Sequence, residues 1–155
     1  METIITTNSQ NWGALFARLA LGITIFPHGA QKLLGWFGGG GFSGTMGFLT
    51  EMAGLPYILA LLVILIEFFG SLLLIFGFFT RVSAVGFIGL FLGVLFTVHS
   101  ENGFFMNWGM EANKGEGWEY FIMVFGLALV ALIQGGGKAS MDAVIAKNNH
   151  PTKPY

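Results

Sequence analysis

Four apolar segments, separated by polar or glycine-rich stretches, follow one another along the chain. They cover residues 12–34, 56–79, 82–98 and 118–134. A helix of about 20 residues, rising 1.5 Å per residue, crosses the roughly 30 Å of hydrocarbon in a bilayer. The fourth segment is short, so we expect this helix to tilt or the bilayer to thin around it. The pattern predicts an all-α, four-helix transmembrane bundle.

The connections between these segments predict how the helices follow one another. Only the dipeptide at positions 80–81 separates the second segment from the third, which predicts a tight antiparallel hairpin. Two longer connections, residues 35–55 and 99–118, then lie together at the other end of the bundle. The first of them is expected to contain a short surface helix that starts near Ser43 or Thr45. The two longer loops therefore share one side of the membrane.

The basic residues favour one orientation of this bundle. The side that carries both termini holds Arg81, Lys138, Lys147 and Lys153, and the other side holds Lys32 and Lys114. Because cytoplasmic loops carry an excess of Lys and Arg, we expect both termini in the cytoplasm and the two longer loops outside. Residues 1–134 are interpreted as a single membrane domain, and residues 135–155 as a cytoplasmic tail.

The composition agrees with a membrane protein. Hydrophobic residues make up 54% of the chain and charged residues 10%, and the mean hydropathy is +0.72. Soluble domains carry about 25% charged residues. The net charge of -1, with no basic run, excludes a nucleic-acid-binding surface of the usual kind. With no cysteine, the chain has no disulfide, no catalytic thiolate and no Cys-ligated iron–sulfur cluster.

Six ionisable side chains stand inside the apolar segments or at their ends, where a charge costs several kcal/mol unless it faces the bundle interior. They are Arg18, His28, Lys32, Glu67, His99 and Glu119. At 100° per residue, the three on the first helix fall within about 80° of one another and share one face. Glu67 lies near the middle of the second helix, between the levels of Arg18 and His28. We expect it to pair with one of these two.

The residues nearest the outer side predict a polar pocket. His28, Lys32, His99 and Glu119 come from three helices and converge there, with Glu67 as the floor. A histidine titrates near neutral pH and a carboxylate can accept its proton, so this pocket can exchange protons with a carbonyl or hydroxyl group. This chemistry suits the headgroup of a quinone, whose reduction needs protons as well as electrons.

A structural interpretation of the same side chains stays open beside this one. Arg18 and Glu67 can form an ion pair that fixes helix register, and Lys32 can extend toward lipid headgroups. His99 and Glu119 can be hydrated helix ends. Two histidines could also ligate a haem across the bundle, but their spacing does not favour it, and we expect neither haem nor a metal.

Four stretches carry a resemblance to a known family: HGAQKLLGWFGGGGFSGTMGFL (28–49), EFFGSLLLIFGFFTR (67–81), HSENGFFMNW (99–108) and GEGWEY (115–120). In these residues the chain resembles the DoxX family of small four-helix membrane proteins, over roughly residues 12–134. The family takes its name from a subunit associated with an archaeal terminal quinol oxidase, and similar subunits occur in thiosulfate:quinone oxidoreductase. Relatives in the wider superfamily are cargo receptors and assembly chaperones, which are not enzymes.

The resemblance implies a shared polar core, which in this chain consists of Arg18, His28, Lys32, Glu67, Arg81, His99 and Glu119. Residues and resemblance together predict a membrane component of a quinone-linked oxidoreductase. His28 and Glu67 would be the catalytic, proton-handling residues. The cofactor-binding residues would be Arg18, Lys32, His99 and Glu119.

The predicted surroundings are the lipid bilayer of a bacterial or archaeal inner membrane, without nucleic acid. Electrons would come from a soluble redox partner or another membrane subunit, because the chain has no cysteine and no haem or flavin motif. A homo-oligomer is compatible with the sequence. The alternative function is a non-enzymatic protein that binds a lipid or small molecule, or an assembly factor, and uses the same pocket without redox chemistry.

Overall fold

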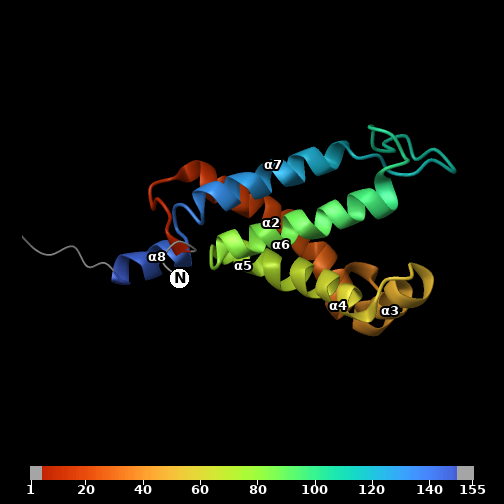
Figure 1. The fold of residues 1–155 in the computed structure, drawn as a ribbon, viewed down its shortest axis with the longest axis horizontal. Helices are drawn as coiled ribbons and strands as arrows, with labels where there is room; N and C mark the ends of the chain where they lie inside the picture. The colour runs from red at the N-terminus through yellow and green to blue at the C-terminus, as the bar shows by residue number, and fades with distance from the viewer. Residues whose placement is uncertain (1–4, 150–155) are drawn as a thin grey trace, which may run out of the picture.

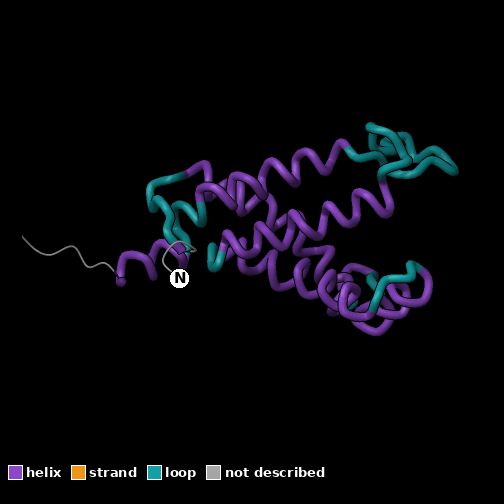
Figure 2. Tube along the Cα trace, in the orientation of Figure 1, coloured by secondary structure: helices purple, strands orange, loops and turns teal. Residues whose placement is uncertain are grey.

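The computed structural model describes residues 5–149, which form helices joined by loops, with no strand among them (Figures 1 and 2). The elements in chain order are α2 (Trp12–Leu34), η1 (Trp36–Gly38), α3 (Gly41–Gly47), η2 (Phe48–Met52), α4 (Tyr57–Leu65), η3 (Ile66–Gly70), α5 (Ser71–Phe76), α6 (Thr80–Val94), η4 (Leu95–His99), α7 (Glu119–Gln134) and α8 (Met141–Asn149). The predicted all-α class is confirmed. The short helix expected near Ser43 is α3.

Three continuous helical stretches in the described part of the chain are long and apolar enough to cross a membrane. They are Trp12–Leu34, Tyr57–Phe76 and Thr80–His99. The fourth, α7, is apolar and has 16 residues, which makes it shorter than the other three. Each of the four falls on one of the predicted segments, and the fourth helix is short, as predicted. Its tilt, or a thinning of the bilayer around it, stays a prediction.

The hairpin between the second and third of these stretches is present, but its turn lies at residues 77–79 rather than 80–81. Gly77 ends α5 with a φ of 66°, a left-handed conformation that glycine adopts without strain. Asp142 then caps the next helix: its carboxylate accepts hydrogen bonds from the backbone N–H groups of Phe79 (2.9 Å) and Thr80 (3.0 Å). Helix α6 therefore begins earlier than its apolar pattern indicates.

Helix α2 crosses the bundle and packs against α5, α7 and η3, while α6 packs against α7. The core between them contains Leu21, Ile25, Leu74 and Phe87, none of which is more than 2% exposed. Small residues allow this close packing, and the alanines at the helix contacts are completely buried: Ala14, Ala84, Ala128 and Ala131. Transmembrane helices commonly associate through small residues, since lipid tails offer no hydrophobic driving force between helices.

Segments from the two ends of the chain lie together at one end of the bundle. The Thr7 hydroxyl donates to the Gln134 carbonyl at 2.9 Å, and the side-chain amide of Asn11 donates to Gln134 Oε1 at 3.0 Å. Helix α8 is at the same end, and the loop 100–118 is at the other (Figures 1 and 2). The cytoplasmic location of the termini stays a prediction. Lys153 and the rest of 150–155 lie outside the described residues.

Candidate functional site

A cavity of about 460 Å³ lies at the end of the bundle that carries the long loops. In Figure 1, the α6–α7 pair and the α2–α4 pair diverge toward this end, and residues of both pairs line the cavity. Its polar lining residues are His28, Lys32, Glu67, Thr97, His99, Glu116 and Tyr120. The other lining residues are apolar. This size and mixture are typical of small-molecule sites, which measure about 300–1,000 Å³ and hold a few polar groups.

An ion pair between two helices forms part of the cavity wall. Lys32 Nζ donates to Glu67 Oε2 at 2.5 Å, and the two side chains are 28% and 7% exposed. The helices can approach this closely because residue 29 is a glycine: a Cβ on Gly29 would lie 2.5 Å from the backbone nitrogen of Phe68. Lys32 follows one helical turn later on the same face, which brings its ammonium group to the Glu67 carboxylate.

Glu67 lies on η3, a π-helical turn that interrupts the helix from Tyr57 to Phe76. The hydroxyl group of Ser71 lies within hydrogen-bond distance of the carbonyl oxygens of Glu67 (2.6 Å) and Phe68 (2.8 Å), which supports the wider turn. A π turn rotates the side chains that follow it relative to a regular helix, and such turns are frequent at functional sites. The widened turn sets which way the carboxylate faces.

His99 ends the third long helix and has one defined partner. Its Nδ1 lies 2.7 Å from the backbone carbonyl oxygen of Glu116. Because a carbonyl can only accept, Nδ1 carries the proton, and in the neutral ring Nε2 is left as an acceptor. The ring also packs against Phe121, with 4.9 Å between the ring centroids. His99 is therefore held by the loop before α7 and is more than a hydrated helix end.

His28 lines the same cavity from α2. Although its neighbours in sequence are apolar, its side chain is exposed. The reason is local. The neighbouring Gly29 and Ala30 are buried at the helix contact, while His28 points toward the cavity at the edge of that contact. An exposed imidazole on a cavity wall is available to a ligand.

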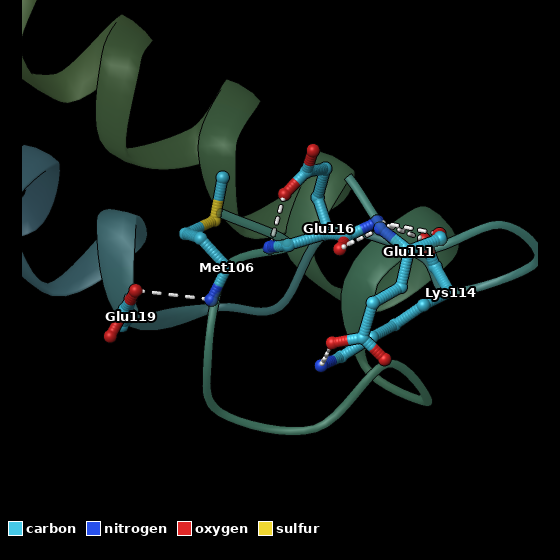
Figure 3. A network of polar contacts seen from close by, with 6 residues as sticks. Met106, Glu111, Lys114, Glu116 and Glu119 are labelled. Carbon is cyan, nitrogen blue, oxygen red and sulfur yellow. Dashed lines mark hydrogen bonds and ion pairs between the residues drawn. The ribbon is translucent and has the colours of Figure 1, made fainter. Parts of the chain in front are cut away.

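Glu119 was predicted to shape the mouth of the pocket, and it instead holds the loop above it. Its Oε1 accepts hydrogen bonds from the backbone N–H of Met106 (3.0 Å) and from the indole N–H of Trp108 (2.8 Å). Figure 3 shows the hydrogen bond from the Met106 N–H to Glu119. It also shows the carboxylate of Glu116, which accepts from the backbone N–H of Asn107, and the ion pair between Lys114 and Glu111. Glu119 is not among the residues that line the cavity.

Arg18 lies at the opposite end of the bundle, and the expected pairing with Glu67 is wrong. The guanidinium group, 1% exposed, donates to five backbone carbonyls at 2.6–3.1 Å. These carbonyls belong to Leu74, Ile75, Gly136, Lys138 and Ala139. The sequence pattern could not reveal this, because the carbonyls lie on a helix end and a loop rather than on a charged side chain.

Three polar residues of the cavity, Thr97, Glu116 and Tyr120, are not among the charged positions inside the apolar segments. Thr97 lies on η4, at the end of the third long helix. Glu116 belongs to the loop before α7 and Tyr120 to its first turn, and both line the cavity. The signal that could have found them is the GEGWEY stretch, which ends one residue before the buried Phe121. Among residues 5–149, no three His, Asp or Glu side chains lie close enough together to hold a metal ion.

Comparisons with known proteins agree with this architecture. The sequence profile of the DoxX family matches residues 13–100. The chain is 31% identical to the Escherichia coli inner membrane protein YqjF over 89% of this chain and 95% of that protein. It is 28% identical to the E. coli inner membrane protein YphA over 83% and 86% of the two chains. It is 35% identical to a Bacillus subtilis protein named "Putative oxidoreductase CatD", over 56% and 59%. No solved structure matches.

Long apolar helices around a partly polar cavity define a helical integral membrane protein. The two E. coli relatives carry the name inner membrane protein, which agrees with the predicted location in an inner membrane. The profile match covers more than half of the chain, and the match to YqjF covers almost all of it. The chain belongs to the DoxX family, as its motifs indicated.

Proposed function

We propose that this protein is a membrane component of a quinone-linked oxidoreductase and that its cavity binds the quinone headgroup. One observation carries the proposal. A partly buried Lys32–Glu67 ion pair and two histidines, His28 and His99, line one cavity of about 460 Å³. Ionisable groups at membrane depth are costly, so their concentration around a cavity favours a function in binding or proton transfer. The name of the B. subtilis relative, which includes the word oxidoreductase, supports the same class.

The available groups fit a quinone headgroup. A bound quinone takes up two electrons and two protons as it becomes a quinol. The Lys32 ammonium, 28% exposed, is a donor that can reach a headgroup carbonyl. Glu67 and the free Nε2 of His99 are acceptors that can receive the hydrogen bonds of quinol hydroxyl groups. The cavity thus offers partners for both redox states.

Proton transfer is assigned to Glu67 and His28, whose side chains line the cavity. Lys32 holds the Glu67 carboxylate in place beside the cavity, where its oxygens are hydrogen-bond acceptors. His28, exposed on the cavity wall, is the group that exchanges a proton with the bound headgroup. The electrons come from a partner subunit or a soluble donor, since the chain has no cysteine and no haem or flavin motif.

The test is mass spectrometry of the small molecules that co-purify with the protein in a mild detergent. The variants are Glu67→Gln and His28→Ala, and the matched control is Glu101→Gln, an exposed carboxylate that does not line the cavity. We expect a stoichiometric quinone with the wild type and the control, and a loss of most of it from both cavity variants.

A contrary result is equally specific. If only phospholipid co-purifies, in equal amounts with all four proteins, the cavity does not select a quinone. The non-enzymatic lipid-binding or assembly function would then account better for the same residues.

A further inference from the structure

A second cavity, a groove on the lipid-facing side, lies between α4 and α6. It adjoins the polar cavity. The α4 side of the groove is formed by Leu59, Leu62 and their apolar neighbours. The α6 side is formed largely by three glycines one turn apart: Gly86, Gly89 and Gly93. Of the lining side chains, Thr97 alone is polar, and its hydroxyl donates to the Gly93 carbonyl at 2.8 Å. The groove therefore offers an almost entirely apolar surface.

The groove and the polar cavity share part of their lining. Leu55, Val63, Val94 and Thr97 belong to both. On the α6 side, the groove extends from Val85 to Thr97, a distance of about 18 Å at 1.5 Å per residue. The groove therefore adjoins the cavity that contains the Lys32–Glu67 pair, and the shared residues are where the two meet.

The dimensions of the groove favour a hydrocarbon chain over a helix. Its volume of about 430 Å³ over about 18 Å of length gives a mean cross-section of about 24 Å². A helix with side chains, about 10 Å across, needs about 80 Å². A hydrocarbon chain is about 4 Å wide, the contact distance between carbon atoms, so even a methyl-branched chain fits.

We propose that the groove between α4 and α6 holds the polyprenyl tail of the ligand whose headgroup occupies the polar cavity. The substrate class is then a long-tailed, membrane-resident quinone that reaches the site sideways from the bilayer. This inference rests on the proposed function, because the headgroup cavity fixes where the tail begins. It adds that tail length and shape, as well as the headgroup, contribute to affinity.

Two glycines allow the groove to be filled without disturbing the fold. A Cβ at Gly89 or Gly93 would meet no atom within 4 Å. The variants Gly89→Leu and Gly93→Leu therefore place a side chain in the groove itself. Gly126 on α7 is also exposed with nothing within 4 Å of its Cβ, and it does not line either cavity. Gly126→Leu is the matched control.

The experiment titrates each detergent-solubilised protein with two ubiquinones that share one headgroup. One carries a long polyprenyl tail and the other a single isoprene unit, and binding is followed by quenching of tryptophan fluorescence. We expect Gly89→Leu and Gly93→Leu to weaken binding of the long-tailed quinone at least about tenfold, which corresponds to about 1.4 kcal/mol. Binding of the short-tailed quinone should not change, and Gly126→Leu should affect neither. The short-tailed ligand also verifies that each variant is folded.

The other outcomes separate this inference from the proposed function. If both quinones bind the wild type and the groove variants leave the long-tailed affinity unchanged, the tail proposal is overturned and the quinone-binding function stands. It is overturned in the same way if those variants alter only the co-purified phospholipid or the oligomeric mass, since a lipid chain or a second copy then occupies the groove. If neither quinone binds the wild type, both proposals fail together.

Discussion

Replacing Arg18 by methionine should destabilise the protein by about 3–5 kcal/mol, because several buried carbonyl acceptors lose their only donor. The side chain is 1% exposed and makes five hydrogen bonds. Methionine fills similar space but donates none of them. For the loop carbonyls of Gly136, Lys138 and Ala139, each buried acceptor left without a donor costs about 1–3 kcal/mol. Water that enters at this end of the bundle can hydrate some of the freed carbonyls. We therefore expect a total cost in the lower half of the range that three such acceptors give.

The assay is unfolding by sodium dodecyl sulfate in mixed micelles, followed by tryptophan fluorescence. The control is Arg81→Met, because Arg81 donates to only two carbonyls, those of Leu132 (2.6 Å) and Thr6 (3.1 Å), and is partly exposed. It should lose roughly 1 kcal/mol, the value of an ordinary hydrogen bond. Arg18→Lys should lie between the two, since an ammonium group has only three donors.

A second readout separates loss of the hydrogen bonds from a general weakening. Lys138 lies over the ring of Trp12, with 3.9 Å from its ammonium nitrogen to the ring centroid. When the loop around Lys138 detaches, trypsin should cut there faster in Arg18→Met than in Arg81→Met. An Arg18→Met protein with the wild-type unfolding midpoint and the wild-type cleavage rate would refute the reasoning, because the carbonyls would then have to be hydrated already.

Three further results are expected. Glu67→Gln should lower stability by about 1–3 kcal/mol. This is less than for a fully buried pair, because the lysine partner is 28% exposed. An unchanged unfolding midpoint would mean that the pair contributes nothing to stability. Gly29→Ala should cost about 1–3 kcal/mol, because the added methyl group forces α2 away from η3. Gly126→Ala has open space around it and should be neutral or slightly stabilising. Equal melting temperatures of the two variants would contradict the close helix contact at Gly29. Single cysteines at the exposed positions Ala112 and Val144 should react with an impermeant maleimide from opposite sides of the membrane, and labelling from the same side would exclude the predicted four-span topology.

The helices could be predicted from the sequence because membrane spans follow from length and hydropathy alone. The predicted first segment, 12–34, coincides with α2, which is bounded by the Asn11 N-cap and the left-handed Gly35. Helix α6 begins before its apolar run because Asp142, far away in sequence, caps it. A tertiary contact of this kind leaves no local signal.

The cavity was harder to predict than the helices. Regular 100° steps put Lys32, His28 and Arg18 on one face of α2, yet only the first two line the cavity. The partner of Glu67 depends on the close approach at Gly29 and on the π turn, and neither follows from a helical period of 3.6 residues. Helical faces therefore indicated which residues point inward, while backbone contacts decided which ones meet.

The carbonyl cage around Arg18 also bears on how the chain is made. The arginine is synthesised among the first residues, and three of its acceptors lie 118 to 121 positions later. At about 5–20 residues per second, the guanidinium group waits several seconds on the ribosome or in the translocon before they emerge. During that interval the first helix carries an uncompensated cation, which favours keeping this end in water. The segment that follows α7 then closes the bundle, so burial of the charge becomes a late step of assembly.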